Sequence, residues 1–363
     1  MKAERRLAPG STIGILGGGQ LGRMLALAAA RLGLRCRIYS DVQAAPAGDV
    51  ALSTTVADYS DADAIAAFAR TVDVVTYEFE NVALAAAEAA AAIVPVYPPP
   101  RALSETQDRL LEKRFLARLG IPVAPFADVP DLPALEAAFA SIGPAAHLKT
   151  RRFGYDGKGQ IRLGEGADLG AALTALGGVP AVLEGHVAFE REISVVAVRG
   201  RSGEVAAYDI PENTHGEGIL RRSQVPAAIG PRTAAAAEAI AAAILADLDY
   251  VGVIGVEMFV IGEAAGEPVL VNEIAPRVHN TGHWTIDACC VSQFENHVRA
   301  ICGWPLGPTA RHSDAEMINL IGREADHWLM LAGEPATAVH LYGKAEARPG
   351  RKMGHATRLR PRD

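Results

Sequence analysis

The sequence predicts an α/β domain with a parallel sheet, followed by a larger α+β region. Over residues 12–92, apolar strand patterns alternate with helical patterns, as they do in parallel sheets. The run Tyr97-Pro98-Pro99-Pro100 ends this alternation, because proline neither continues a helix nor donates to a strand ladder. Short strands around glycine-rich loops follow, which indicates a mixed or antiparallel sheet.

Length and composition fit a multidomain enzyme. The chain has 363 residues, 50% of them hydrophobic and 21% charged, and at roughly 100–200 residues per domain we expect two or three domains. Its formal charge of −7 has the wrong sign for a protein that binds nucleic-acid phosphates. The four cysteines form no CxxC motif, so we expect neither a zinc site nor a redox site, and a reducing cytoplasm fits best.

The apolar stretches are too short for a membrane segment. The runs 234–245 and 251–261 contain Glu238 and Glu257, and both fall short of the ~20 residues that span a bilayer. The start of the chain is basic and then apolar, like a signal peptide, but the apolar part breaks at the glycines 17–19. We therefore expect a protein that is neither membrane-embedded nor exported.

The first domain is expected to contain three strands and three helices. The strands are Thr12–Leu16, Cys36–Tyr39 and Val72–Thr76, and the helices are Met24–Leu32, Asp61–Arg70 and Ala85–Ala92. A GxGxxG motif at Gly17, Gly19 and Gly22 joins the first strand to the first helix, and Asp41 follows the second strand, as in a Rossmann-like dinucleotide site. A turn that permits close packing, or that binds another phosphate, explains the motif equally well.

The region after the prolines changes from helices to short strands. Helices are expected at Thr106–Leu119, Pro133–Ser141 and Thr233–Leu248. Strands are expected at Ala146–Thr150, Gln160–Leu163, Ala181–Glu184, Ile193–Arg199, Glu204–Ile210, Val253–Val260, Pro268–Ile274 and Met317–Ile321.

A second glycine cluster, Gly154-Tyr155-Asp156-Gly157-Lys158-Gly159, lies between two expected strands. It does not precede a helix, so it is not a Walker-type loop. Its backbone N–H groups can fold over a polyphosphate, with Lys149 on the preceding strand and Lys158 at the tip as positive charges. A surface turn with solvated lysines is the alternative.

Glu257 and Glu273 lie in two apolar strands joined by the polar turn 262–268, and both are equally far from Ala265 at its centre. In a hairpin of that register the two carboxylates face each other, where like charges repel unless a cation lies between them. A magnesium ion shared with nucleotide phosphates is the natural occupant. Asn272 points to the other face unless the strand is irregular there. Two solvated edge glutamates would fit poorly with the apolar neighbours.

Three further segments are rich in groups that bind anions or polar substrates. Residues 276–284 include Arg277, whose guanidinium suits bidentate contact with an oxyanion. Residues 344–355 are basic, and their internal Pro-Gly favours an ordered phosphate-binding turn over a disordered tail. Residues 76–81, TYEFEN, follow the third strand at the sheet edge where α/β proteins bind ligands, and their acids suggest contact with an amine or hydroxyls.

Six segments together resemble one enzyme family: GGGQLGRM (17–24), YEFENV (77–82), DRLLEK (108–113), RRFGYDGKGQ (151–160), NEIAPRVHNTGHW (272–284) and RPGRKMGH (348–355). Their order is similar to that of the ATP-grasp superfamily and, within it, of the N5-carboxyaminoimidazole ribonucleotide synthase family. The resemblance covers about residues 12–357. It implies that Gly17–Gly22 belong to a domain that precedes the ATP-grasp fold and form no nicotinamide site.

The resemblance implies four units. They are a Rossmann-like pre-ATP-grasp domain at 1–100, an ATP-grasp small subdomain with the glycine flap at 101–188, an ATP-grasp large subdomain with the metal site at 189–309, and a small β-rich C-terminal subdomain at 310–363. Relatives usually continue after the RPGRKMGH segment through a strand and a closing helix, whereas this chain stops at Asp363. We therefore expect the last unit to be shorter than usual.

The resemblance also implies a set of site residues. ATP would be held by Arg109, Lys149, Gly154, Tyr155, Asp156, Gly157, Lys158, Gly159, Gln160, Glu184, Gly185, His186, Val187, Glu192, His215, Asn272 and Glu273. Adenine would contact 184–187, Glu192 would bind the ribose, and Glu257 with Glu273 would bind magnesium, or manganese in its place. The catalytic residues would be Tyr155, Asp156, Arg277, His279 and Asn280, and the substrate would be bound by Glu78, Lys344, Arg351 and Lys352.

The implied reaction is the ATP-dependent carboxylation of 5-aminoimidazole ribonucleotide by bicarbonate, through carboxyphosphate, in purine biosynthesis. A cytoplasmic homodimer and functional coupling to the following mutase are implied as well. Other ATP-grasp ligases, such as a glycinamide ribonucleotide transformylase or a biotin-dependent carboxylase subunit, are the first alternative, and the HNTGHW and RPGRKMGH segments argue against them. A Rossmann dehydrogenase using Gly17–Gly22 and Asp41 is the alternative from another class, and a non-catalytic nucleotide-binding regulator is the last.

Overall fold

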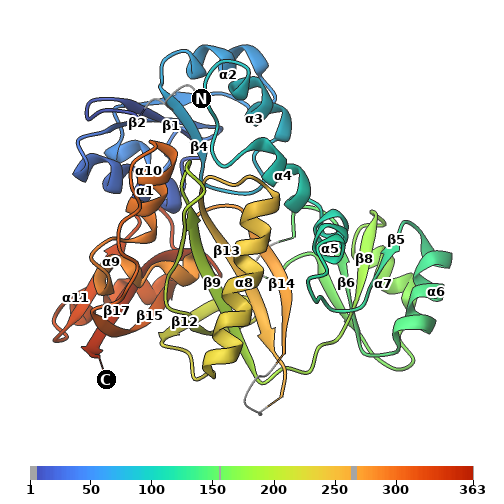
Figure 1. Ribbon diagram of the computed structural model, residues 1–363. Helices are drawn as coiled ribbons and strands as arrows, with labels where there is room; N and C mark the ends of the chain where they lie inside the picture. Colours follow the sequence, from blue (N-terminus) through green and yellow to red (C-terminus); the bar gives the residue numbers. More distant parts are fainter. Residues whose placement is uncertain (1–5, 155–156, 263–267, 363) are drawn as a thin grey trace.

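A computed structural model describes residues 6–154, 157–262 and 268–362. Three sheets carry the fold, and Figure 1 shows them as a first domain at the top, a central sheet below it and a small lobe to the right. Within the described residues, every helix falls short of the length and apolar character of a membrane-crossing segment.

The first domain is the parallel α/β unit that the sequence predicts. Its sheet has the order β3-β2-β1-β4, formed by β1 (Thr12–Leu16), β2 (Arg35–Ser40), β3 (Ser53–Val56) and β4 (Val74–Tyr77), all parallel. The helices α2 (Ala62–Ala69) and α3 (Leu84–Ala91) lie close to their expected bounds, whereas α1 (Gln20–Arg31) begins about one turn before the expected Met24. Strand β3 was not expected, because this short edge strand is nowhere fully buried and has no apolar run.

The segment after the prolines forms two helices, α4 (Pro100–Thr106) and α5 (Arg109–Arg118), so the expected single helix Thr106–Leu119 is wrong at its start. Asp108 breaks the helical path because its side chain accepts hydrogen bonds from the N–H groups of Leu110 and Leu111, at 2.9 and 3.3 Å. This cap places Arg109 and Lys113 on the first turns of α5.

The small lobe is a four-stranded antiparallel sheet of order β5-β8-β6-β7 with two helices. Its elements are β5 (Phe126–Val129), α6 (Leu132–Ile142), β6 (Ala146–Thr150), β7 (Gln160–Leu163), α7 (Leu169–Ala175) and β8 (Ala181–Gly185). The hairpin β6–β7 pairs Lys149 with Gln160, so the glycine cluster connects two antiparallel strands, as expected.

The central sheet has nine strands in the order β14-β13-β9-β11-β12-β15-β17-β16, with β10 beside β9. They are β9 (Arg191–Arg199), β10 (Val205–Ala207), β11 (Glu212–Gly216), β12 (Ile219–Val225), β13 (Gly252–Val260), β14 (Val269–Ala275), β15 (Ser313–Ile321), β16 (Thr337–Leu341) and β17 (Lys352–Pro361). Every pairing is antiparallel. The expected strand Glu204–Ile210 is only the three residues of β10.

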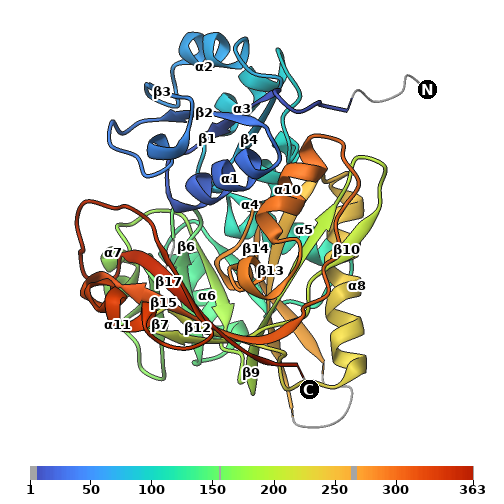
Figure 2. The same cartoon turned by 90° about the vertical axis from the view of Figure 1, so that its left-hand side faces the viewer.

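Two helices pack on the central sheet. Helix α8 (Pro231–Asp247) buries Ala237, Ala241, Ile244 and Leu245, a stripe at helical spacing, against β9 and β13. Helix α10 (Gln293–Ile301) contacts β13 and β9 on one side and α1 on the other, so it joins the first domain to the sheet, as Figure 2 also shows. The short helices α9 (Thr285–Ala288) and α11 (Trp328–Ala332) lie near the last strands.

The C-terminal segment completes the central sheet. Strand β17 follows the basic residues 344–351 and runs for ten residues between β15 and β16. Strand β17 begins inside the RPGRKMGH segment, and the expectation that this unit is shorter than usual stays a prediction.

Candidate active site

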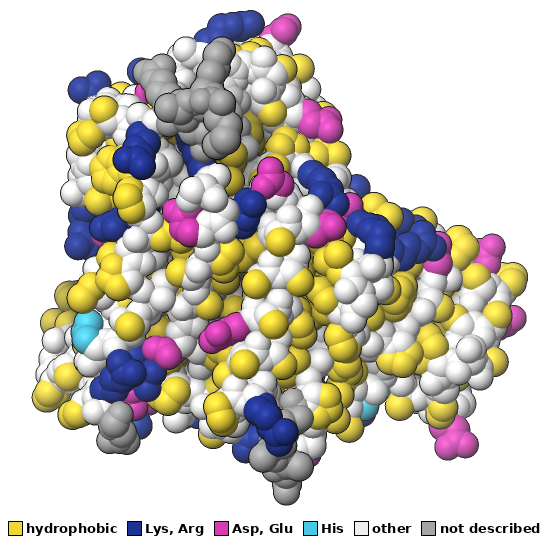
Figure 3. All heavy atoms as spheres, in the orientation of Figure 1, with side chains coloured by type: hydrophobic (Ala, Val, Ile, Leu, Met, Phe, Trp, Pro, Cys, Tyr) yellow, Lys and Arg dark blue, Asp and Glu magenta, His cyan; other side chains and the backbone are white. Residues whose placement is uncertain are grey.

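A cleft of about 1000 Å³ lies where the first domain, the small lobe and the central sheet meet. In the space-filling view the first domain and the small lobe project from the main body, and side chains of both charges are scattered over the visible face (Figure 3). The predicted residues that line the cleft are Glu78, Arg109, Lys149, Gly154, Gly157, Lys158, Gln160, Glu184, Gly185, His186, Val187, Glu192, His215, Glu257, Asn272, Glu273, Arg277, His279, Asn280, Lys344, Arg351 and Lys352. Gly159 does not line it, and Tyr155 and Asp156 lie outside the described residues.

The two glutamates of the β13–β14 hairpin face each other. Glu257 pairs directly with Glu273, which confirms the predicted register, although the turn residues 263–267 lie outside the described part. The register then shifts by one residue between Glu257 and Met258, which pairs with Val271. Asn272 is the extra residue of this bulge and lines the cleft together with Glu273. Strand β14 is therefore irregular at Asn272, and this irregularity brings Asn272 to the same cleft as Glu273.

The electrostatics of this pair suit a divalent cation. Burial and the charge of Glu273 raise the pKa of Glu257 to about 7, because two carboxylates this close cannot both ionise without cost. Arg109, on α5, donates from Nη1 to Glu273 Oε2 at 3.2 Å. Its positive charge offsets part of the negative charge of the two glutamates. Two carboxylates and the Asn272 amide are oxygen donors of the kind that magnesium prefers.

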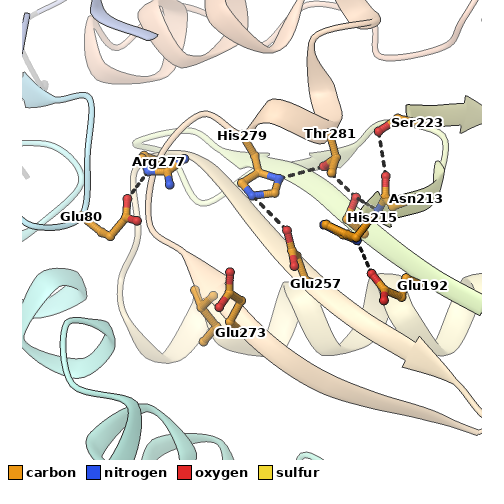
Figure 4. Close-up of polar contacts among 12 residues, drawn as sticks. Glu80, Glu192, Asn213, His215, Ser223, Glu257, Glu273, Arg277, His279 and Thr281 are labelled. Atoms are coloured by element: carbon orange, nitrogen blue, oxygen red, sulfur yellow. Dashed lines mark hydrogen bonds and ion pairs between the residues drawn. The ribbon is translucent and has the colours of Figure 1, made fainter. Parts of the chain in front are cut away.

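His279 stands beside Glu257, with its Nε2 atom 3.3 Å from Glu257 Oε1 (Figure 4). Burial and the neighbouring Arg277 lower the pKa of His279 to about 3, so the imidazole is neutral at pH 7. Its other ring nitrogen, Nδ1, is 2.8 Å from the Thr281 hydroxyl. The side chain is therefore hydrogen-bonded at Nδ1 and lies close to a carboxylate oxygen at Nε2.

The wall formed by the small lobe is centred on Glu184. Lys149 on β6 donates to Glu184 Oε2 at 3.0 Å, and Lys113 on α5 lies 3.6 Å from the same oxygen. Burial opposes ionisation of Glu184, but the charges of the two lysines outweigh it and lower its pKa to about 2. Lys113 also donates to the carbonyl of Asn272 at 2.7 Å. This buried lysine thus ties the small lobe to the β13–β14 hairpin.

On the opposite wall, the His215 ring nitrogen Nδ1 contacts the carboxylate of Glu192. Phe189 and Phe259 stack nearby, with their ring centroids 4.6 Å apart and an angle of 11° between the rings. All four side chains line the cleft. They provide an apolar platform beside a polar pair, which suits a base and a sugar.

The glycine motif of the first domain is occupied by a side chain from its own sheet. Glu78, directly after β4, accepts hydrogen bonds from the N–H groups of Gly19 at 2.7 Å and Gly22 at 3.0 Å. A Cβ atom at Gly17, whose φ is +114°, would lie 2.2 Å from the Cγ atom of Glu78. The helix N-terminus that would bind a dinucleotide phosphate therefore holds a carboxylate instead.

Arg277 and the basic C-terminal turn form the remaining side of the cleft. The Nε atom of Arg277 donates to the carboxylate of Glu80 from the first domain (Figure 4). Its Nη1 atom donates to the carbonyl of Val278 at 3.1 Å. Lys344 donates to the carbonyl of Lys352 at 2.7 Å, so it closes the turn that carries Arg351.

Sequence reasoning missed several residues of this site. Glu80 and Lys113 lie in two of the six segments that carry the family resemblance. No pattern in the sequence links Glu80 to Arg277 or Lys113 to Glu184. Glu112, whose pKa burial raises to about 8, accepts a hydrogen bond from the N–H group of Ile274 at 2.6 Å. Such contacts join positions more than 70 residues apart, with separations of 197 for Arg277 and Glu80 and 162 for Ile274 and Glu112.

Three family models match the chain in succession. They describe a ribonucleotide synthetase preATP-grasp domain at residues 10–107, an ATP-grasp domain at residues 114–294 and a phosphoribosylaminoimidazole carboxylase C-terminal domain at residues 315–363. The fold class and the order of units predicted from the sequence agree with this succession.

Curated and solved proteins give the same result. The N5-carboxyaminoimidazole ribonucleotide synthase of Brucella melitensis is 52% identical over 98% of both chains. A solved ADP complex of an N5-carboxyaminoimidazole ribonucleotide synthetase is 40% identical, with a TM-score of 0.94 over 99% of this chain and 94% of the other. The Aspergillus clavatus synthase with ADP and 5-aminoimidazole ribonucleotide is 31% identical, with a TM-score of 0.90 over 97% and 94%.

Proposed function

Because the chain belongs to the N5-carboxyaminoimidazole ribonucleotide synthase family of ATP-grasp ligases, we propose that its cleft joins bicarbonate to the exocyclic amine of 5-aminoimidazole ribonucleotide, a step of purine biosynthesis. One observation supports this most directly. A single cleft brings together the lysine wall around Glu184, the facing pair Glu257 and Glu273, and the basic turn at Arg351. These three parts suit a nucleotide, a metal and a phosphorylated acceptor, respectively.

ATP would lie between the small lobe and the central sheet. Lys149, Lys158 and Arg109 would meet the phosphates, and the strand end Glu184–Val187 would hydrogen-bond adenine. Phe259 would pack against the base, and Glu192 with His215 would hold the ribose. The pairing of Lys149 with Glu184 supports this arrangement, because it fixes the lysine on the wall of the cleft before any nucleotide enters.

Magnesium would be held by Glu257, Glu273 and the Asn272 amide, and it would supply positive charge at the phosphate oxygens. Burial and the charge of Glu273 raise the pKa of Glu257, and a cation between the carboxylates would remove the second of these causes. Arg109 holds the Glu273 carboxylate in position from the other side.

The acceptor would lie between the first domain and the C-terminal turn. Lys344, Arg351 and Lys352 would bind its ribose phosphate, and Glu78 would contact the ribose or the amine from the glycine motif. Arg277, His279 and Asn280, with Tyr155 and Asp156, would surround bicarbonate and the imidazole. Every described member of this set lines the same cleft.

The reaction would then proceed in three steps. A bicarbonate oxygen attacks the γ-phosphorus, the bond from phosphorus to the ADP oxygen breaks, and carboxyphosphate forms while Lys149, Lys158 and Arg277 stabilise the charge. Carboxyphosphate divides into carbon dioxide and phosphate. The exocyclic amine attacks the carbon of carbon dioxide and loses one proton to give the carbamate. The flap residues Gly154 and Gly157 line this space, where water must be kept from the intermediate.

Oxygen-18 transfer tests the proposed intermediate. When labelled bicarbonate is mixed rapidly with enzyme, ATP, magnesium and the imidazole, one label is expected in the released phosphate. Phosphate without label would show that water, and not bicarbonate, attacks the γ-phosphorus. A cytoplasmic homodimer and coupling to the following mutase belong to the same proposal, and sedimentation of the chain with and without the mutase tests both.

A further inference from the structure

A chain of buried hydrogen bonds runs from the central sheet to His279. Ser223 on β12 donates to Asn213 Oδ1 at 2.7 Å, and Asn213 on β11 donates from Nδ2 to Ser194 Oγ at 3.1 Å. Ser194 on β9 donates to Thr281 Oγ1 at 2.7 Å, and the Thr281 hydroxyl lies 2.8 Å from His279 Nδ1. Figure 4 shows Ser223 next to Asn213 and Thr281 next to His279.

The members of this chain are all buried, with exposures of 0% for Ser194, Ser223 and Thr281 and 6% for Asn213. No water competes for their hydrogen bonds at such exposures, so each hydroxyl must use the partners that the structure gives it. None of the four lines the cleft, and the proposed reaction assigns none of them a role.

The order of donors and acceptors fixes where each proton lies. An amide nitrogen can only donate, so Ser194 accepts from Asn213 and must direct its own proton to Thr281. Thr281 then accepts from Ser194 and directs its proton to His279. The Nδ1 atom of His279 is therefore the acceptor, and the ring proton of the neutral imidazole lies on Nε2.

The other end of the imidazole agrees with this tautomer but does not fix it. The Nε2 atom lies 3.3 Å from Glu257 Oε1. An N–H group on Nε2 would point toward this oxygen. The hydroxyl of Thr281 on the other side therefore decides the proton position.

We propose that Ser223, Asn213, Ser194 and Thr281 are positioning residues that hold His279 as the Nε2–H tautomer, so that it acts as a fixed hydrogen-bond donor beside Glu257 and not as a general base. Only the role of His279 beside the metal position rests on the proposed function. The tautomer itself can be measured without substrates. It gives His279 one task, which is to keep the Glu257 carboxylate oriented toward the metal position.

Asn213→Asp tests the direction of the chain with an almost isosteric side chain. At a pH where the new carboxyl group is ionised it has no proton to give, so Ser194 must donate to it, Thr281 must donate to Ser194, and His279 must donate from Nδ1 to Thr281. The expected result is a reversed tautomer, with an unprotonated Nε2 facing Glu257. Ser223→Ala is the matched control, because it removes a hydroxyl at the end of the chain and leaves the Asn213 to Ser194 direction unchanged.

The measurement is the nitrogen-15 spectrum of the imidazoles in protein labelled at histidine, with the His279 signals assigned through His279→Gln. We expect a protonated Nε2 and an unprotonated Nδ1 in the parent protein and in Ser223→Ala, and the reverse in Asn213→Asp. Turnover of Asn213→Asp should fall about ten- to a hundredfold, as is usual when a group behind a site residue is lost, with KM for ATP unchanged. A parent protein with the proton on Nδ1, or the same tautomer in Asn213→Asp, would overturn the proposal.

Two readouts separate this proposal from its premise. If the parent protein shows no bicarbonate-dependent ADP release, the proposed function fails while the tautomer result stands. If Asn213→Asp unfolds, Thr281→Val replaces it. That variant deletes the hydroxyl next to His279, and it should mix the two tautomers; one unmixed Nε2–H signal would contradict the inference.

Discussion

The Glu78 carboxylate occupies the glycine motif of the first domain, where it accepts a hydrogen bond from the N–H group of Gly19 at 2.7 Å. The same carboxylate reaches Gly22, so the donors that would hold a dinucleotide phosphate are already satisfied. A strand–glycine–helix pattern thus has a second use, in which it anchors an acid at the edge of a substrate cleft. A phosphate entering here would meet a negative charge.

Nucleotide selectivity follows from this arrangement. We expect ATP with magnesium to raise the melting temperature of the protein, because it binds the folded state, and NADH to leave it unchanged. Differential scanning fluorimetry with both ligands at equal concentration measures this. A shift with NADH that disappears in Gly19→Ala would restore the dehydrogenase alternative.

Glu273→Gln is expected to lose nearly all ADP formation. The change keeps the size of the side chain but removes one of two facing charges, and it weakens both the metal position and the hydrogen bond from Arg109. We expect a fall of about a hundredfold or more in turnover, as for the loss of a group that stabilises transition-state charge. Glu334→Gln, which alters a glutamate paired with Arg358 outside the cleft, is the control. Parent-like turnover of Glu273→Gln would remove the metal assignment.

Glu80→Gln should affect bicarbonate more than ATP. The Glu80 carboxylate orients Arg277 through Nε, and Nη2 of Arg277 donates to no partner in the described ranges, which leaves it for an oxyanion. Burial opposes ionisation of Glu80, but the charge of Arg277 outweighs it and lowers the pKa to about 2. We expect KM for bicarbonate to rise about tenfold, which corresponds to one charge-assisted hydrogen bond, while KM for ATP stays constant. Equal changes in both constants would contradict this role of Glu80.

Glu184→Gln should destabilise the protein most at neutral pH. The pKa of Glu184 is lowered from 4.5 to about 2, so the folded state favours the carboxylate. Its contribution is full above pH 4.5 and is lost as the pH falls toward 2, and by linkage it amounts to about 3 kcal/mol. Urea unfolding at pH 7 and pH 3.5 should show a difference between variant and parent that shrinks at the lower pH. A constant difference would mean that Glu184 does not stabilise the protein through its charge.

Patterns local in sequence predicted much of the fold. The pairing of Glu257 with Glu273 was predicted from the symmetry of the turn between them, and the structure has that pair, but it arises through the bulge at Asn272, without which Glu257 would pair with Asn272. The start of α5 could have been placed as well, because Asp108 before the helical pattern is a capping signal. Helix α10 carries a similar signal, since Ser292 caps it by accepting from Glu295 N–H.

Contacts between distant elements could not be predicted. The pairing of Lys113 with Glu184 depends on how α5 packs against β8, and the chain Ser223–Asn213–Ser194–Thr281 needs three strands and a loop in their final positions. Strands β11 and β12 were also missed, since their exposed and polar residues, such as Thr214 and Arg222, interrupt any apolar alternation. The sequence indicates which residues are chemically suited to the site, and tertiary packing decides which of them meet.

The central claim, that one cleft couples ATP cleavage to carboxylation of an aminoimidazole, is tested most directly by ADP release. The assay supplies ATP and magnesium, with and without 5-aminoimidazole ribonucleotide, and with bicarbonate added or stripped. We predict that rapid release requires both the imidazole and bicarbonate. Release that is indifferent to the imidazole would contradict the claim and would assign the ATP site to another acceptor.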